Sequence, residues 1–375
     1  MPDNDGVVRR RRVCRTVQLG RVRIGGDAPI SIQTMTKTDT RDTAATIAQI
    51  RELDMAGCDI VRLAVPDAEA AAALADICRA VDLPLVADVH FDYRLALQAL
   101  QAGVAGLRIN PGNIGNRDRV REVARAAAQR GVPIRIGVNA GSLEKDILAR
   151  HGAPTAAAMV ESAQRHVRIL EDQQFYDIKL SVKASDLTRT VQAYRRLAAL
   201  TDYPLHLGVT EAGTLLAGAV RSSAALALLL ADGIGDTIRI SLTEHPLQEV
   251  RAAQALLRSL ELAPPGPAVV ACPTCGRVEI DAVSLAHRVE QALEKLAGEF
   301  PGAVWPVVAV MGCMVNGPGE AREADLAVVG GRGCVALYVA GRHQATMSED
   351  EVLPELLRLV RCFLAQHPEK PGGAA

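Results

Sequence analysis

The sequence predicts an α/β protein in which a (β/α)8 barrel of the TIM type precedes a small α/β domain. The first observation is a succession of eight short β-rich runs separated by alanine-rich stretches with helical periodicity. The second is the length of the region that holds these runs, which suits one closed barrel. The third is a proline-rich break near residue 265, after which a cysteine-containing segment begins.

The expected barrel strands begin roughly 20 to 45 residues apart, which leaves room for one helix after each strand. Several helical stretches end in glycine, the residue most often found just past a helix end, as at Gly57, Gly103 and Gly131. The expected strands are 30–35, 59–65, 83–90, 106–111, 133–140, 176–185, 203–213 and 237–243.

Polar residues recur at alternate positions of these strands, toward the carboxyl ends. Alternate residues of a barrel strand share the interior, and barrel enzymes carry their chemistry at the carboxyl ends of the strands. Any one of these side chains could be a structural hydrogen-bonding group, but the whole set indicates a functional site. The set comprises Arg62, Asp88, His90, Arg108, Asn110, Arg135, Asn139, Ser181, Lys183, His206, Thr210, Arg239 and Ser241.

Positive charge dominates this set, because five of its members are arginine or lysine, whereas Asp88 and the nearby Glu211 are the carboxylates. Guanidinium groups match phosphate oxygens in bidentate geometry. We therefore expect a small phosphorylated or diphosphorylated metabolite. No phosphate-binding loop or dinucleotide fingerprint precedes a helix, so we do not expect a nucleotide.

The overall composition argues against a nucleic-acid or membrane partner. The 42 basic and 43 acidic residues give a net charge of −1. The longest apolar stretch, 224–235, is too short to span a bilayer, and we expect a cytoplasmic protein. The arginine run at 9–12 has no apolar run behind it, so we interpret it as a solvated N-terminal arm and not as a targeting signal.

The proline-rich segment predicts a boundary between two domains. We expect a barrel domain at 13–261, an extended linker at 262–267 and an α/β domain at 268–365. The expected elements of the second domain are a helix at 278–298, a strand at 305–313, two strands at 326–331 and 334–341, and a helix at 349–364.

Three cysteines of the second domain lie in glycine- or proline-rich sequence: the pair Cys272 and Cys275, and Cys313. Each of the other five cysteines stands alone and is expected to be a small buried residue. Glu320 follows Cys313 by seven residues, after a loop with the sequence NGPG. Three thiols and one carboxylate form an unusual ligand set.

The spacing leaves three interpretations of these cysteines open. A disulfide would leave one thiol over. A structural zinc site needs four ligands, and Cys334 or His343 could supply the fourth. An iron–sulfur cluster held by three thiolates would leave one iron for Glu320, a weaker ligand that could give way to a substrate oxygen.

The ordered motifs resemble the family of 4-hydroxy-3-methylbut-2-enyl diphosphate synthases, in its bacterial two-domain form, over residues 13–362. Lys37 stands where that family commonly has Asn. The motifs are DAPISIQTMT, VRLAVP, ADVHFD, LRINPGN, IRIGVNAGSLE, LSVKASD, PLHLGVTEAG, GIGDTIRISLT, ACPTCGR and GCMVNGPGEA.

The resemblance implies an oxidoreductase of the methylerythritol phosphate route to isoprenoids. It would open the ring of 2-C-methyl-D-erythritol 2,4-cyclodiphosphate reductively, with loss of water, to give 4-hydroxy-3-methylbut-2-enyl diphosphate. The family uses a 4Fe-4S cluster, takes electrons from flavodoxin or ferredoxin, and forms homodimers. The alternative is a barrel enzyme that acts on a phosphorylated or pterin-like substrate and has a structural zinc in its tail domain.

The resemblance also assigns roles to residues. The cluster ligands would be Cys272, Cys275, Cys313 and Glu320. The catalytic residues would be Glu211 as proton donor, Glu320, Asp88 and His90. Substrate would be bound by Arg62, Arg108, Asn110, Arg135, Asn139, Lys183, Thr210, Arg239, Ser241 and Asn316.

Overall fold

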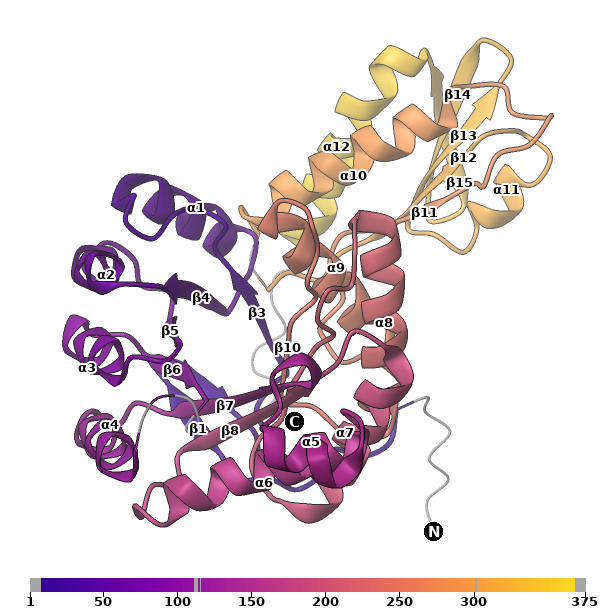
Figure 1. The fold of residues 1–375 in the computed structure, drawn as a ribbon. Helices are drawn as coiled ribbons and strands as arrows, with labels where there is room; N and C mark the ends of the chain where they lie inside the picture. Colours follow the sequence, from indigo (N-terminus) through magenta and orange to yellow (C-terminus); the bar gives the residue numbers. More distant parts are fainter. Residues whose placement is uncertain (1–7, 111–113, 115, 301, 368–375) are drawn as a thin grey trace. The chain divides into compact units, whose positions relative to one another are not determined.

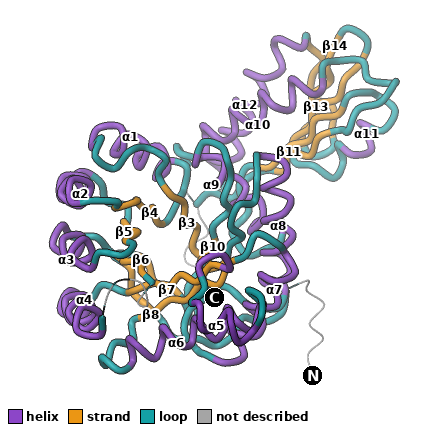
Figure 2. The backbone as a smooth tube through the Cα atoms, in the orientation of Figure 1, coloured by secondary structure: helices purple, strands orange, loops and turns teal. Residues whose placement is uncertain are grey.

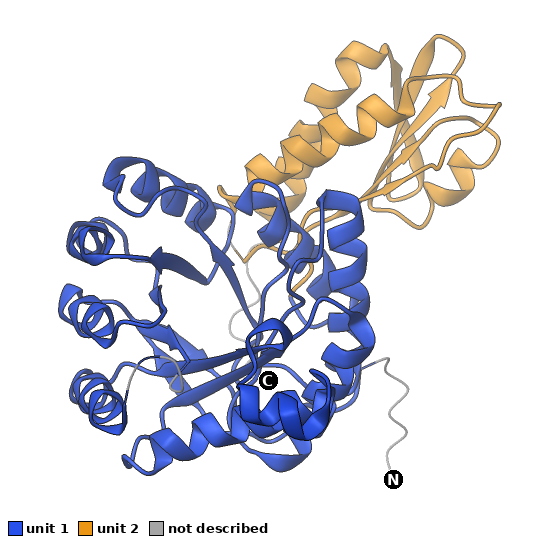
Figure 3. Cartoon of the chain, in the orientation of Figure 1, with its two compact units in different colours: residues 1–263 blue, residues 264–375 orange. Residues whose placement is uncertain are grey.

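The computed structural model describes residues 8–110, 114, 116–300 and 302–367. The chain divides into two compact units, residues 1–263 and 264–375 (Figure 3). The division falls within the proline-rich segment, between Ala263 and Pro264. Each unit has its own hydrophobic core, and the two are described separately below.

Within the described residues, unit 1 contains eight parallel strands in the order β8-β7-β6-β5-β4-β3-β10-β9. A parallel bridge between Leu180 and Leu205 joins the two outer strands, and the helices surround the strands (Figures 1 and 2). This arrangement confirms the predicted barrel. The strands are β3 (Ser31–Met35), β4 (Ile60–Val65), β5 (Leu85–Val89), β6 (Gly106–Ile109), β7 (Ile134–Asn139), β8 (Ile178–Lys183), β9 (His206–Leu207) and β10 (Thr237–Ile238).

Capping residues define the ends of several helices of unit 1. Asp42, Asp67 and Asp92 each accept a hydrogen bond from a first-turn backbone N–H, and Gly103 and Gly131 end helices in the left-handed conformation. The helices are α1 (Thr43–Met55), α2 (Ala68–Ala80), α3 (Tyr93–Ala102), α4 (Arg117–Arg130), α5 (Lys145–His151), α6 (Ala156–Glu171), α7 (Leu187–Leu200), α8 (Leu215–Ala231) and α9 (Pro246–Ser259).

An N-terminal hairpin, which the sequence patterns did not reveal, closes the amino-terminal end of the barrel. Its strands β1 (Val17–Leu19) and β2 (Val22–Ile24) pair in antiparallel fashion. Leu19 and Ile24 pack against Ile60 and Val86, which face the barrel interior at the starts of their strands. The hairpin therefore excludes water from the end of the barrel opposite the expected active site.

The interpretation of residues 9–12 as a solvated arm was wrong for Arg11 and Arg12, whereas Arg9 and Arg10 are exposed. The guanidinium of Arg11 lies 2.7 Å from the buried carboxylate of Asp236, and Arg12 donates to the carbonyl of Tyr203 at 2.7 Å. The backbone N–H of Arg12 also donates to the carbonyl of Gly233 at 2.9 Å. The arm binds here because the turn before β10 offers a buried carboxylate and backbone carbonyls that need partners.

In the described part of unit 2, one sheet has the order β11-β12-β13-β14-β15, with the first three strands parallel and the last two antiparallel to their neighbours. The prediction had missed β11 and β15. Both are edge strands with mostly exposed residues, so neither has a strong apolar pattern. The elements are β11 (Ala268–Ala271), α10 (Ala282–Ala297), β12 (Val307–Met311), α11 (Gly317–Glu320), β13 (Leu326–Gly331), β14 (Cys334–Val339), β15 (Arg342–Met347) and α12 (Glu349–Gln366).

Candidate functional site

The carboxyl ends of the barrel strands surround a cavity of about 200 Å³. It is lined by side chains from seven of the eight barrel strands or from the one to three residues that follow them. All of them belong to the polar set identified in the sequence. The described lining residues are Arg62, Asp88, His90, Arg108, Arg135, Asn139, Ser181, Lys183, Thr210, Arg239 and Ser241.

Two glycines make room for cationic side chains of adjacent strands: Gly137 on β7 lies beside Arg108 on β6, and Gly208, directly after β9, lies beside Lys183 on β8. A Cβ atom on Gly137 would lie 2.6 Å from Nε of Arg108, and one on Gly208 would lie 2.7 Å from Nζ of Lys183. Both distances are shorter than real Cβ contacts, so a larger residue would force the cationic side chains to shift, and at Gly208 the Cβ would also lie 2.8 Å from the backbone oxygen of Arg239. In both cases glycine occupies the position that lies against a buried cationic side chain of the adjacent strand.

Asp88 is the only carboxylate among the described residues that line the cavity. Its Oδ1 lies 2.9 Å from Nη1 of Arg108, its Oδ2 lies 3.5 Å from Nε of Arg62, and His90 approaches to 3.3 Å. Burial opposes ionisation of this group, but the two guanidinium groups and His90 outweigh it and hold the pKa of Asp88 far below its usual range. Asp88 therefore remains negatively charged and holds two of the cations in place.

Glu249 anchors a further cation from outside the cavity, and the sequence prediction did not include it. Its carboxylate lies 3.3 Å from Nε of Arg239 and accepts hydrogen bonds from the hydroxyl of Thr34 at 2.7 Å and the backbone N–H of Leu242 at 3.0 Å. Lys37 also approaches Glu249, at 3.6 Å, and donates to the carbonyl of Leu242. The sequence does carry one sign of this role, because Glu249 is a charged residue on the buried face of α9.

The remaining cations lack such partners. Arg135 is buried, and its Nε and Nη2 atoms have no hydrogen-bond partner among the described residues. Burial, followed by the repulsion of neighbouring arginines, lowers the pKa values of Arg135 and Lys183 well below their ordinary values. A cavity with several cations and one carboxylate is an electrostatic site for an anion.

Four predicted residues of the substrate or catalytic set are not among those that line the cavity, and one of them, Glu320, belongs to unit 2 and is described with the cluster residues below. Asn110 is buried directly after β6. Glu211 is exposed, and its φ of 54° lies in the left-handed region, which a non-glycine residue rarely adopts. Asn316 belongs to unit 2, where it precedes α11.

The predicted cluster residues lie in loops at one edge of the unit 2 sheet. Strands β11 and β12 are parallel neighbours with Ala271 opposite Val310, and the backbone N–H of Cys272 donates to the carbonyl of Val310 at 2.9 Å. Cys272 and Cys313 therefore follow the carboxyl ends of adjacent strands. Glu320 ends the short helix that begins four residues after Cys313.

The ligand chemistry of these loops suits an iron–sulfur group. Backbone N–H groups of Val315 and Asn316 hydrogen-bond the thiol of Cys313 and lower its pKa, which favours the thiolate that binds metals. Among the described residues, however, no three His, Cys, Asp or Glu side chains are gathered closely enough to hold a metal ion. The predicted ligands have suitable chemistry for an iron–sulfur cluster and lie at one edge of the sheet. Their side chains are not close enough to one another to hold a metal ion in this structure.

Of the two further residues considered as zinc ligands, Cys334 lies at the same end of the sheet as Cys272 and Cys313, since β14 begins at the carboxyl end of β13, whereas His343 lies at the opposite end. His343 lies on the edge strand β15, where it is 2.9 Å from the hydroxyl of Thr346 and contacts the ring of Tyr338 edge-on. Cys334 begins β14, which is two strands away from β12. Neither residue completes a set of four with the predicted cysteines among the described side chains.

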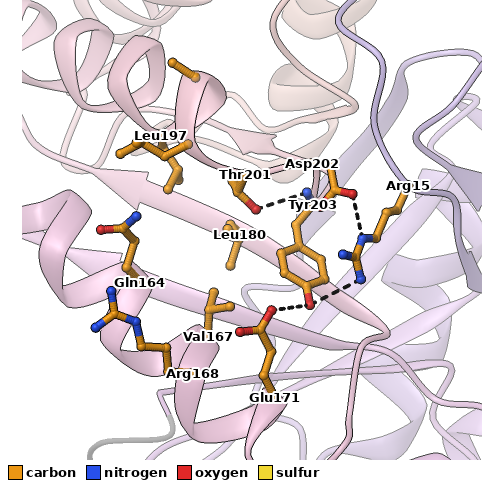
Figure 4. Close-up of a pocket in the computed structure, with 12 residues that line it drawn as sticks. Arg15, Gln164, Val167, Arg168, Glu171, Leu180, Leu197, Thr201, Asp202 and Tyr203 are labelled. Carbon is orange, nitrogen blue, oxygen red and sulfur yellow. Dashed lines mark hydrogen bonds and ion pairs between the residues drawn. The ribbon is translucent and has the colours of Figure 1, made fainter.

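A second hollow, of about 460 Å³, lies on the outside of the barrel between α6 and α7 (Figure 4). Its polar groups bind one another: Arg15 is 2.9 Å from Asp202, and the hydroxyl of Tyr203 is 2.9 Å from Glu171. Arg15 also stacks over the ring of Tyr203. These contacts are at the amino-terminal side of β9, where barrel residues serve stability and not catalysis.

Comparison with protein families gives two matches along the chain. Residues 14–254 match the GcpE TIM-barrel domain, and residues 268–362 match the GcpE protein C-terminal domain. None of the helices in the described ranges is both long and apolar enough to cross a membrane.

Curated relatives match the chain along nearly its whole length. Relatives from Symbiobacterium thermophilum and Geobacter sulfurreducens are each 53% identical to it, over 93% and 94% of this chain and 93% and 98% of their own. Both are named 4-hydroxy-3-methylbut-2-en-1-yl diphosphate synthase (flavodoxin). A solved dihydropteroate synthase of Stenotrophomonas maltophilia is 15% identical over 67% of this chain and 99% of its own, with a TM-score of 0.47, too low to support an inference.

Proposed function

The chain belongs to the GcpE family, and from that premise we propose that it reduces 2-C-methyl-D-erythritol 2,4-cyclodiphosphate to 4-hydroxy-3-methylbut-2-enyl diphosphate. The reaction is a two-electron reductive ring opening with loss of water, in the methylerythritol phosphate route to isoprenoids. The alternative of a phosphorylated or pterin-like substrate with a structural zinc is not favoured, because relatives 53% identical to the chain are named as diphosphate synthases.

The observation that best supports this function is the charge of the cavity. Arg62, Arg108, Arg135, Lys183 and Arg239 surround a space of about 200 Å³ in which Asp88 is the only carboxylate among the described lining residues. A diphosphate would satisfy the guanidinium atoms that have no hydrogen-bond partner in the described part of the chain. Asn139, Ser181, Thr210 and Ser241 would donate further hydrogen bonds, and Asn110 would support them from beside the cavity.

We propose that a 4Fe-4S cluster binds to Cys272, Cys275, Cys313 and Glu320. When bound, such a cluster supplies electrons and a Lewis-acidic iron for the cleavage of a carbon–oxygen bond. Asn316, in the same loop as Glu320, would contact the substrate. The chemistry of the ligands and their placement on one sheet edge support this assignment.

The protein's own groups would bind the substrate and supply a proton. Asp88 and His90 would hold the guanidinium groups of Arg62 and Arg108 in position for the phosphates. Departure of the hydroxyl group as water consumes one proton, which Glu211 would donate from its carboxyl oxygen. The strained backbone of Glu211 is compatible with a functional role.

The proposed protein partners are flavodoxin or ferredoxin as electron donor and a second copy of the chain. Flavodoxin appears in the names of the relatives. Support for a homodimer comes from α8, whose outer face exposes Leu216 by 78% and Val220 by 62%. Eight free thiols suit a reducing compartment, and we propose that the enzyme works in the cytoplasm.

The test is anaerobic purification followed by turnover with the cyclodiphosphate and a chemical reductant. We expect a brown protein that bleaches in air and contains iron and sulfide. Glu320→Ala should keep most of the iron and lose at least ~10-fold of the turnover, because the carboxylate is proposed as a ligand that can be displaced. The matched control is Glu323→Ala, which removes an exposed carboxylate three residues away.

Two results would contradict the proposal. Unchanged turnover in Glu320→Ala would remove this residue from the mechanism. A colourless protein with stoichiometric zinc after anaerobic preparation would exclude the cluster. Mössbauer or EPR spectra recorded with and without the cyclodiphosphate would show directly whether the iron environment responds to the substrate.

A further inference from the structure

A second polar layer lies inside the barrel beneath the cavity. It consists of Gln33 on β3, Lys179 on β8 and His206 on β9, whose exposed fractions are 1%, 2% and 0%. Lys179 lies two residues before Ser181 on the same face of β8, and it is directly opposite Arg135 on β7. Since Ser181 lines the cavity, Lys179 lies two residues, roughly 7 Å, deeper along β8.

The polar atoms of this layer have no hydrogen-bond partners among the residues that the structure describes. Nζ of Lys179, both ring nitrogens of His206, and the side-chain oxygen and nitrogen of Gln33 make no hydrogen bond to any described residue. Leaving such groups buried without partners is costly. A buried ammonium group is the most costly of them, because a charge loses more solvation than a dipole.

The charged groups that face Lys179 do little to stabilise its ammonium form. Arg135 faces it from β7, and Lys183 and Arg62 add to the positive field around His206. The nearest carboxylate by electrostatic effect is Asp236, but Arg11 already pairs with it at 2.7 Å.

The other groups around the layer are neutral or already paired. The hydroxyl groups of Ser31 on β3 and Thr237 on β10 bond to one another at 2.9 Å. Asp88 on β5 is held by Arg62 and Arg108. Within the described interior, no carboxylate is available to neutralise Lys179.

The consequence is a lysine that is easily deprotonated. Burial first, and then the repulsion of Arg135, lower the pKa of Lys179 to about 7, while Asp236 opposes this change weakly. The same two effects lower the pKa of His206 well below its ordinary value, so this residue stays neutral. Lys179 is then the member of the layer whose charge can change near neutral pH.

We propose that Lys179 takes up a proton from solvent when a dianionic diphosphate enters the cavity above it. A negative charge one layer away compensates the field of the arginines, and in a low-dielectric interior this favours the ammonium form. The layer thus adds a positive charge beneath the substrate only when the substrate is present. This inference rests on the proposed diphosphate substrate.

The substrate does not itself take up or release protons when it binds near neutral pH. Each phosphorus of a cyclic diphosphate carries one strongly acidic hydroxyl group and no group that titrates near neutral pH. Its charge is therefore constant between pH 6 and 9, and any proton taken up on binding goes to the protein. Lys183 contacts the cavity directly and can take up a proton too, so the contribution of Lys179 has to be separated by substitution.

The test is isothermal titration calorimetry of the cyclodiphosphate into the anaerobic enzyme without reductant, in buffers of different ionisation enthalpy. At pH 8 the wild type should take up about one proton more than Lys179→Met, and this difference should vanish near pH 6, where Lys179 is already protonated. Above pH 7, the ratio of the wild-type affinity for the cyclodiphosphate to the affinity of Lys179→Met should fall by up to ~10-fold per pH unit. The matched control is Lys145→Met, which removes an exposed lysine at the start of α5.

Each outcome has a distinct meaning. Equal proton uptake in the wild type and Lys179→Met assigns the proton to Lys183 and overturns the inference. Binding without proton uptake in the wild type also overturns it, whether or not the variant folds, and leaves the proposed function intact. No binding of the cyclodiphosphate to the wild type would refute the proposed function itself.

Discussion

Replacement of Asp88 by asparagine tests whether the cavity depends on a single buried negative charge. The substitution keeps the size of the side chain but removes the charge that lies 2.9 Å from Arg108 and 3.5 Å from Arg62. Breaking a buried ion pair by removing one partner costs about 3–5 kcal/mol, because the other charge stays buried and uncompensated. For a domain of this size, that corresponds to a fall in melting temperature of roughly 6–20 °C.

The assay is thermal unfolding followed by circular dichroism at pH 7.5, with Asp118→Asn as the matched control. Asp118 lies 3.3 Å from Arg121, but its side chain is 80% exposed. An exposed pair of this kind contributes at most about 1 kcal/mol. Sulfate should recover part of the stability lost in Asp88→Asn, since an anion can replace the missing carboxylate beside the arginines.

The pH dependence gives a second, independent criterion. The folded protein lowers the pKa of Asp88, so its contribution to stability is complete above the unfolded value of about 3.9 and is lost as the pH falls below it. The difference in melting temperature between the wild type and Asp88→Asn should therefore become smaller at acidic pH. The reasoning is refuted if Asp88→Asn melts within a degree or two of Asp118→Asn at pH 7.5 without added anion.

Two further substitutions test the packing around the site. Gly208→Ala would place a Cβ 2.7 Å from Nζ of Lys183 and 2.8 Å from the backbone oxygen of Arg239. We expect a loss of about 1–3 kcal/mol in melting experiments, because the backbone oxygen cannot move aside as a flexible side chain can. We also expect weaker binding of the cyclodiphosphate in calorimetry, and wild-type affinity would show that the lysine can move aside. Asp236→Asn removes the partner of Arg11 and should lower the unfolding free energy by about 3 kcal/mol in urea titrations; an unchanged midpoint would mean that the N-terminal arm adds no stability.

The sequence predicted the barrel and the residues of its cavity because both follow from local periodicity. Arg135 and Asn139 share a face of β7, as do Ser181 and Lys183 on β8, and a period of two is visible without any knowledge of the partner strands. The closed parallel order of the strands then brings these faces together.

The sequence did not predict features that depend on contacts distant along the chain. Glu249 supports Arg239 from a helix on the outside of the barrel, and no motif connects the two. Arg11 pairs with Asp236 across more than 200 positions, so its run of basic residues suggested a solvated arm. The roles assigned to Glu211 and Asn316 came from family resemblance alone and stay predictions.

The parallel pairing of β11 with β12 has a consequence for how the enzyme matures. Four consecutive residue pairs hold these strands in register, and Cys272 itself donates to β12, so backbone hydrogen bonds and not iron fix the distance between the two cysteine-bearing loops. If the proposed cluster is lost to oxygen, unit 2 should therefore stay folded. Repair would then require the return of iron and sulfide and the gathering of the ligand side chains around them, on strands already in register.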